Sequence, residues 1–298
     1  MEIRSFKYNK EEDFAAIMTF LDDLFIRTRS YENWFPDRFE NSSDSREDGI
    51  LVWKEIENSR PKIVALTTRD SPRDFFLQVD PNYRFIEQEM IEWIQKYFNE
   101  RKKIHNKNEM IQINILEGNS QREKLLRDLG FEYKQIYGYY RIRKGNAPIP
   151  NFKSPESFKI RPVKRTEFNQ LAQLIRRVFG HGEWFTAEIL DGITKASFYR
   201  PELDLVAVNE SDIIGSFCTF RVNSLSSIIS LEPMGTNPDF RRIGLAKALL
   251  TEGFKRCEKY NPPFIYIDGA ANTPAANRLY EVTGFTKKMA INSWIKEI

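Results

Sequence analysis

The chain has 298 residues, of which 41% are hydrophobic and 29% are charged, and its formal net charge is +3. This length suits two domains, and the composition excludes a disordered or fibrous protein. The sequence has no apolar run long enough to cross a bilayer and no signal-peptide pattern at its start, so we expect a cytoplasmic protein without a membrane partner. A small net charge, nearly balanced in each half, argues against nucleic acid as a partner.

The first half is predicted to contain a strand, a helix and a series of strands. Residues 11–25 carry apolar side chains at helical spacing, and β-like runs follow at 49–56, 62–68 and 74–80. The polar and aromatic residues 29–49 could form a lid or an ordinary surface loop. The phrase "DPNYR" leads into a long helix, followed by a strand, a short helix, a Gly-Phe pair and an aromatic-rich strand.

The second half repeats this order. A strand at 158–163 and a helix at 166–179 precede β-like runs at 204–209, 213–222 and 227–236; "NPDFR", a helix, a strand, a short helix and a Gly-Phe pair follow. The repeated order predicts an internal duplication. We therefore predict domains at 1–145 and 159–298, joined by a proline-containing linker at 146–158.

The turn "RRIGLAK" at 241–247 has the features of a phosphate-binding helix start. The unpaired N–H groups and the positive dipole end of a helix N-terminus attract phosphates. Gly244 and Ala246 are small enough to let the backbone approach a diphosphate, and Arg241, Arg242 and Lys247 add positive charge.

Three stretches of the second half together resemble the GNAT acetyltransferase superfamily. Arg241-x-x-Gly244-x-Ala246 is similar to its acyl-CoA pyrophosphate loop, "LEPMGTNPD" to its splayed thioester-binding strand, and "NTPAANRLYEVTGF" to its second signature. The resemblance covers residues 159–298 strongly and 1–143 only in outline. It implies two tandem domains of mixed α/β (α+β) fold, each with a mixed, mostly antiparallel sheet flanked by helices.

The resemblance also implies acetyl-CoA as the co-substrate. The residues implied to hold it are Met234, Gly235, Thr236, Arg241, Arg242, Ile243, Gly244, Leu245, Ala246, Lys247, Asn272 and Asn277. Asn272 or Thr273 could cap the helix that follows. Tyr280 is implied to be the general acid, because a phenol with a reference pKa of about 10 is protonated at neutral pH. Glu232 is either a general base on the thioester strand or a solvated surface residue.

We therefore expect an N-acetyltransferase that acts on a primary amine of a small molecule or peptide by direct attack on the thioester. The alternative is a non-catalytic acyl-CoA-binding or partner-binding module; a tRNA-dependent aminoacyl transferase is disfavoured by the near-neutral first half. The loop at 181–185, with His181 and Trp184, could receive the amine or be a surface loop around a buried tryptophan. Two scattered histidines predict no metal site, and Cys218 and Cys257 should be buried free thiols.

The first half lacks the residues that carry this chemistry. In register at Arg84 and Arg241, Glu87 falls on Gly244 and Glu89 on Ala246, so both carboxylates are predicted to lie where a diphosphate would bind. Like charges so close repel strongly. Leu126 falls on Tyr280, and we expect no acyl-CoA site in the first domain.

Overall fold

The structure, a computed structural model, describes residues 2–43, 47–57, 60–105 and 108–298. It divides into two compact units. Unit 1 comprises Met1–Gly138 and Met289–Ile298, and unit 2 comprises Tyr139–Lys288. No helix among the described residues has the length and apolar character needed to span a membrane.

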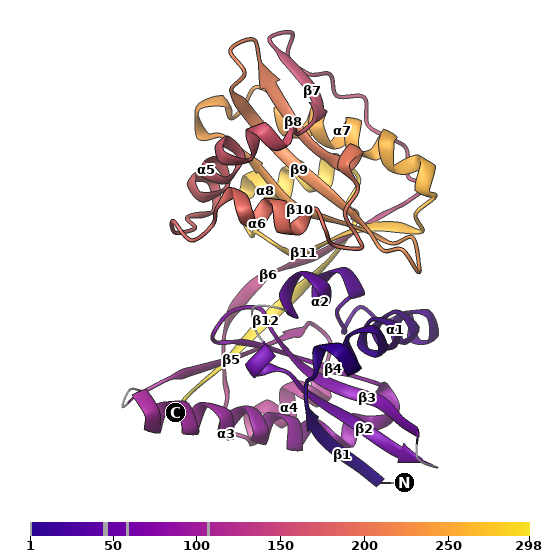
Figure 1. The fold of residues 1–298 in the computed structure, drawn as a ribbon, viewed down its shortest axis with the longest axis vertical. Helices are drawn as coiled ribbons and strands as arrows, with labels where there is room; N and C mark the ends of the chain where they lie inside the picture. The colour runs from indigo at the N-terminus through magenta and orange to yellow at the C-terminus, as the bar shows by residue number, and fades with distance from the viewer. Residues whose placement is uncertain (1, 44–46, 58–59, 106–107) are drawn as a thin grey trace. The chain divides into compact units, whose positions relative to one another are not determined.

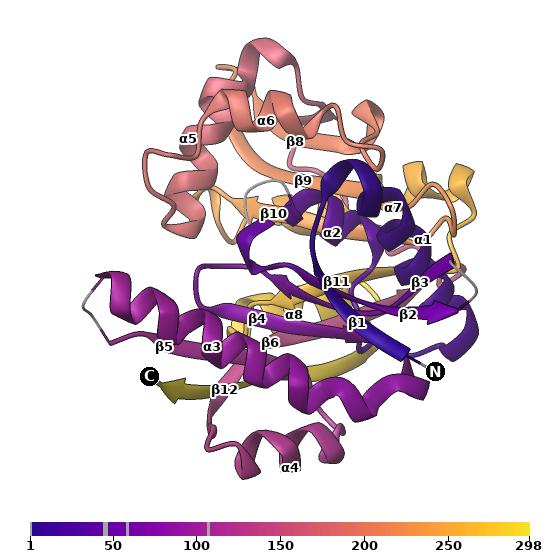
Figure 2. The ribbon, with the colours of Figure 1, turned by 60° about the horizontal axis from the view of Figure 1, so that its bottom comes forward.

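Unit 1 is a mixed sheet with helices on both faces (Figures 1 and 2). Its neighbouring strands run β1-β2-β3-β4-β5-β12, and all these pairs are antiparallel except β4 with β5. The elements are β1 (Glu2–Lys7), α1 (Lys10–Thr28), α2 (Pro36–Ser43), η1 (Glu47–Gly49), β2 (Leu51–Glu57), β3 (Arg60–Arg69), β4 (Asp74–Val79), η2 (Pro81–Ile86), α3 (Glu87–His105), β5 (Met110–Leu116), α4 (Ser120–Asp128) and the end of β12 (Lys287–Glu297).

Unit 2 repeats the plan, with neighbouring strands β6-β11-β10-β9-β8-β7 and one parallel pair, β10 with β11. Each sheet is therefore mixed and mostly antiparallel, which confirms the predicted fold class. The elements are the end of β6 (Glu132–Lys144), β7 (Phe158–Pro162), η3 (Arg165–Glu167), α5 (Phe168–Phe179), α6 (Ala187–Ile193), η4 (Pro201–Leu203), β8 (Asp204–Asn209), β9 (Ile214–Val222), β10 (Ile229–Thr236), η5 (Pro238–Phe240), α7 (Leu245–Cys257), η6 (Glu258–Tyr260), β11 (Phe264–Ala270) and α8 (Pro274–Val282).

The final part of the last strand of each half belongs to the compact unit of the other half. Residues 139–144 of β6 pair with β11, and residues 291–297 of β12 pair with β5. The predicted ranges 1–145 and 159–298 assume that each half keeps its own last strand, so the compact units differ from them at these two segments. The alternation of side chains along a strand specifies which face is buried, not which copy of an equivalent neighbour the strand pairs with.

The sheet of unit 2 separates two hydrophobic cores. One lies on the side of α7 and α8 and contains Cys218, Phe220, Leu249 and Tyr280; the other lies on the side of α5 and α6 and contains Phe217. Alternate residues of β9 thus point to opposite faces. Cys218 and Cys257 are buried and free, as predicted.

Unit 1 also has a core on each face of its sheet. The described part of residues 29–49 contributes to one of them. Trp34, Phe35 and Phe39 are buried, and Trp34 and Phe39 pack with α1 against the sheet. This segment is therefore a packed layer of unit 1, because its aromatic side chains supply apolar surface that a lid or a surface loop would leave exposed.

Candidate functional site

Strands β10 and β11 of unit 2 pair only at their beginnings. Ile229 is opposite Ile265 and Ser230 is opposite Tyr266, and no later residues of these strands form described pairs. β10 remains paired with β9 as far as Thr236, with a bulge between Leu231 and Met234. The main-chain groups of β10 that face away from β9 beyond Ser230 are therefore not used by a β11 ladder and can bind a ligand.

Gly235 has a packing role in this part of β10. A Cβ at this position would lie 2.5 Å from Cζ of Phe217 and 2.9 Å from Cγ1 of Val178. The glycine therefore lets the side chains of β9 and α5 approach the strand closely, in addition to any contact with a ligand.

The turn between β10 and α7 forms an open set of backbone donors. Arg242 and Gly244 have φ angles of 69° and 94°, both in the left-handed region. The first helical bond of α7 runs from the N–H of Ala248 to the carbonyl of Gly244, and no side chain caps the helix. Successive N–H groups in such a turn make a concave anion-binding site.

The residues predicted to line this turn lie together. Arg241, Arg242 and Ile243 are exposed, Ala246 and Lys247 are half-buried, and Leu245 is buried in the core, so only its main chain can reach a ligand. Nε of Arg241 donates to the carbonyl oxygen of Thr236 at 3.3 Å. Nothing lies within 4 Å of a Cβ built on Gly244. The space beside the start of α7 is therefore not filled by protein atoms.

Helix α8 is capped by Thr273, whose hydroxyl accepts from the N–H of Ala276 at 3.2 Å. Asn272 instead accepts a hydrogen bond from Nδ2 of Asn277 at 3.2 Å. Asn277 in turn accepts from the guanidinium of Arg141 on β6. Asn272 and Asn277 are thus linked at the start of the helix that carries Tyr280.

Tyr280 is buried in the core between the sheet and α7 and α8. Its ring packs edge-on against Phe285 at 5.5 Å, and Met234 of β10 contacts the same core. Burial raises the pKa of Tyr280 to about 12, and the nearby Arg141 charge opposes this rise. Among the described residues, none forms a hydrogen bond with its hydroxyl group. The phenol is therefore protonated and has an unused donor.

Glu232 is half-exposed at the bulge of β10, with 49% of its side chain accessible. It forms an ion pair with Nη1 of the buried Arg221 on β9 at 3.3 Å. The sequence does not predict that Arg221 and Arg141 are buried near the site. A single arginine within a strand pattern has no periodic signal that distinguishes a buried side chain from a solvated one.

The loop between α5 and α6 carries an exposed aromatic cluster. Trp184 is 64% exposed, so the alternative of a buried tryptophan is wrong. The ring of His181 lies 5.3 Å from that of Trp184 and 5.4 Å from that of Phe185. Among the described residues, no group of three or more His, Cys, Asp or Glu side chains could hold a metal ion.

Unit 1 retains the splayed strands but lacks the left-handed turn that precedes α7 in unit 2. β4 and β5 form only two described residue pairs. Asp74 is opposite Gln112, and Phe75 is opposite Ile113. No residue of η2 or the first turn of α3 has a positive φ, so the chain enters α3 without the concave turn seen before α7. Leu126 is buried in the core of unit 1.

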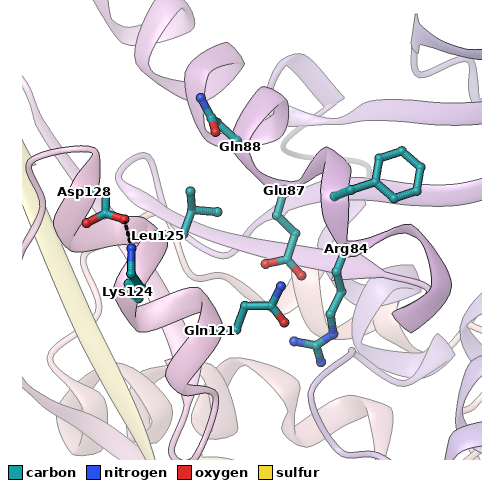
Figure 3. A pocket seen from close by; sticks show the side chains of 8 residues that line it. Arg84, Glu87, Gln88, Gln121, Lys124, Leu125 and Asp128 are labelled. Carbon is teal, nitrogen blue, oxygen red and sulfur yellow. Dashed lines mark hydrogen bonds and ion pairs between the residues drawn. The ribbon is translucent and has the colours of Figure 1, made fainter.

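Unit 1 fills the equivalent region with its own side chains. Glu87 is 2% exposed, and its two carboxylate oxygens accept from Nε and Nη2 of Arg122 at 3.0 and 2.8 Å. Nη1 of Arg122 lies 3.5 Å from the carbonyl oxygen of Leu77, which corresponds to Met234 of unit 2. A hollow of about 250 Å³ remains beside Glu87, lined by Arg84, Phe85, Glu87, Gln88, Gln121, Lys124, Leu125 and Asp128 (Figure 3).

The prediction for Glu89 is wrong. Its carboxylate accepts from Nε1 of Trp53 at 2.8 Å, so it lies against β2 and not beside Glu87. Two positions along an α-helix correspond to a rotation of about 200°, which puts the two side chains on nearly opposite sides of α3.

Comparisons with known proteins agree with this geometry. Residues 168–285 match the model of the acetyltransferase (GNAT) family. No curated protein matches the chain. Among solved structures, a GCN5-related N-acetyltransferase from Sphaerobacter thermophilus is 17% identical, with a TM-score of 0.71 over 99% of this chain and 95% of that chain.

Two further structures match nearly the whole chain. A tandem GNAT protein from the clavulanic acid biosynthesis pathway is 11% identical, with a TM-score of 0.69 over 99% of this chain and 98% of that chain. N-myristoyltransferase from Saccharomyces cerevisiae is 13% identical, with a TM-score of 0.60 over 98% of this chain and 78% of that chain. At these identities the likeness concerns the fold.

Proposed function

We propose that the chain is a tandem GNAT-type N-acetyltransferase, because residues 168–285 match the GNAT family model and the whole chain shares the fold of a tandem GNAT protein. It transfers the acetyl group of acetyl-CoA to a primary amine of a small molecule or peptide. The observation that carries this proposal is that unit 2 combines an uncapped helix start after a left-handed glycine, a splayed strand and a buried tyrosine with a free hydroxyl.

In this proposal the turn before α7 binds the diphosphate. The amides of Gly244 to Lys247 donate to its oxygens, and Arg241, Arg242 and Lys247 offset its charge. The pantetheine follows the main chain of β10 beyond the bulge, where Met234 and Thr236 offer backbone hydrogen bonds. A main-chain N–H near Met234 also stabilises the oxyanion that forms when the thioester is attacked.

The chemical step needs one proton donor and one proton acceptor. The amine nitrogen forms a bond to the carbonyl carbon, the carbon–sulfur bond breaks, and its electron pair moves to sulfur. The pKa of Tyr280, about 12, keeps its phenol protonated at neutral pH. This phenol donates its proton to the sulfur. The proton released by the attacking amine passes to Glu232 or to water at the half-exposed bulge.

Unit 1 is proposed to bind no acyl-CoA. The ion pair between Glu87 and Arg122 fills the region equivalent to the turn and splayed strand of unit 2. The partners of these charges are thus side chains of the protein, and a diphosphate would have to displace a buried, bidentate ion pair.

A thiol-release assay tests the function. The whole chain is incubated with acetyl-CoA and a panel of amines, amino acids and peptides, and the acetylated product is identified by mass spectrometry. We expect amine-dependent release of CoA with a stoichiometric gain of one acetyl group. CoA binding without turnover on any amine would instead support the non-catalytic acyl-CoA-binding module.

A further inference from the structure

Arg141 is a buried arginine whose hydrogen-bonding capacity is not fully used. It lies on β6 opposite Ile267 of β11 and is 0% exposed. Its Nη2 donates to Oδ1 of Asn277, whereas its Nε is buried without a hydrogen-bond partner among the described residues. The described residues therefore leave part of the hydrogen-bonding capacity of this guanidinium unused.

The guanidinium lies beside the proposed proton donor. Its central carbon is 5.6 Å from the ring centroid of Tyr280 and 5.8 Å from that of Tyr139. Asn277 precedes Tyr280 by three residues on α8, so the two side chains are neighbours on the helix surface. The bond from Arg141 to Asn277 therefore connects β6 to the helical turn that carries the phenol.

Arg143 provides a direct comparison on the same strand. Two residues further along β6, it is also buried, but its Nε donates to the carbonyl of Thr283 and its Nη2 to those of Ala147 and Pro148. These main-chain bonds account for Arg143 as a structural residue. The same explanation does not cover Arg141, for which the described part of the chain supplies one side-chain hydrogen bond and leaves Nε unpaired.

Building on the proposed function, we propose that Arg141 is a positioning residue for Tyr280. It orients the phenol through Asn277 and supplies positive charge beside the sulfur that leaves the acetyl group. When the carbon–nitrogen bond forms and the carbon–sulfur bond breaks, negative charge is shared between the sulfur and the phenol oxygen that gives it a proton. A buried cation stabilises that charge on either atom, and the phenolate recovers its proton from solvent.

Other titratable groups also face this position. They are Tyr139 on β6, Tyr280 and Glu281 on α8, and Cys218 on β9, with the ammonium of Lys288 lying 3.7 Å from the Tyr139 ring. Burial lowers the pKa of Arg141, and attraction by Glu281 and the two tyrosines opposes this change.

A double-mutant cycle tests the link to Tyr280. Arg141→Met should lower kcat by about 10- to 100-fold and change the KM for acetyl-CoA by less than about threefold. Arg141→Lys, which keeps the charge, should recover most of the rate. In a Tyr280→Phe background, Arg141→Met should cost clearly less than in the wild type, because the orientation of the phenol no longer contributes and only the charge beside the sulfur is lost.

The control is Arg143→Met, which should lower Tm but leave kcat unchanged in the folded protein. If Arg141→Met does not fold, Asn277→Ala cuts the same link at a half-buried position and should show the same loss of effect in the Tyr280→Phe background. Equal fold-changes in both backgrounds, or a change in Tm and KM alone, would overturn the proposal.

A binding measurement tests the charge without requiring an amine. Calorimetry at pH 6.5 and 9.5 compares CoA with acetyl-CoA; a thiol ionises near pH 8.5, whereas the thioester does not ionise. Arg141→Met should weaken CoA binding about tenfold more at pH 9.5 than at pH 6.5. For acetyl-CoA, the loss of affinity should be the same at both pH values. An equal loss for CoA at both pH values would overturn the inference alone, whereas a chain that binds neither ligand would refute the proposed function and this inference with it.

Discussion

Replacing Gly244 with alanine should weaken CoA binding more than it destabilises the fold. The φ of Gly244 is 94°, in the left-handed region that an alanine adopts at a cost of about 1–2 kcal/mol. In a domain of this size each kcal/mol lowers Tm by about 2–4 °C. The variant should therefore remain folded at room temperature.

The effect on the ligand is larger because the new methyl group enters the proposed diphosphate site. No protein atom lies within 4 Å of the added Cβ, so the substitution creates no internal clash. It instead displaces a ligand from the first amides of α7. Losing one hydrogen bond to a charged phosphate costs about 1.5–3 kcal/mol, which raises Kd by about 10- to 100-fold.

Gly118 provides a matched control. Its φ is 90°, and nothing lies within 4 Å of a Cβ built there, but it is in the loop between β5 and α4 of unit 1. Gly118→Ala should lower Tm by a similar amount and leave the Kd for CoA unchanged. Calorimetric titration of both variants separates backbone strain from ligand contact. If Gly244→Ala bound CoA as tightly as Gly118→Ala does, the turn before α7 would not be the diphosphate site.

Three further predictions concern separate features of the chain. Tyr280→Phe should reduce kcat by about 10- to 10⁴-fold with little change in CoA affinity; a wild-type rate would assign the tyrosine to packing alone. Titration of the whole chain with CoA should give one site per chain, and a value near two would contradict an ion pair of Glu87 and Arg122 that excludes the ligand. Glu202, which accepts from Lys259 and Tyr260, has a pKa lowered to about 2. A lowered carboxyl pKa stabilises the fold above the unfolded value of about 4.3, so the stability difference between wild type and Glu202→Gln should shrink as the pH falls from about 4.3 towards 2; a constant difference would refute this assignment.

Local patterns were sufficient to predict much of unit 2. Gly244 and Gly284, the glycine of the predicted Gly-Phe pair, both have a positive φ, and the predicted short helix is α8, which starts at Pro274 and carries the buried Tyr280. These features depend on residues that are close in sequence, where the identity of a side chain restricts the backbone directly. The order of strands and helices follows from the same local periodicities.

Features that depend on distant partners could not be predicted in this way. β6 and β12 each carry a pattern that suits either sheet, so nothing in the strand itself specifies its partner. Arg141 finds its hydrogen-bond partner, Asn277, 136 residues away in the sequence. Arg122 forms its ion pair with Glu87, which lies 35 residues earlier. The direction of Glu89 was predictable in principle from helical rotation, but its indole partner on β2 was not.

The two units differ in what occupies the region between the splayed strand and the start of the long helix. In unit 1, Arg122 binds both oxygens of Glu87 and approaches the splayed strand, so the equivalent groups are paired within the chain. In unit 2, no side chain caps the start of α7, and Nε of Arg141 has no hydrogen-bond partner among the described residues. The open start of α7 is therefore where we propose that a ligand binds, because the main-chain N–H groups of an uncapped helix start can donate to it. We therefore expect that the residue at the position of Gly244, together with the one opposite it on the short helix, determines whether this region binds a ligand or is filled by an ion pair of the chain itself.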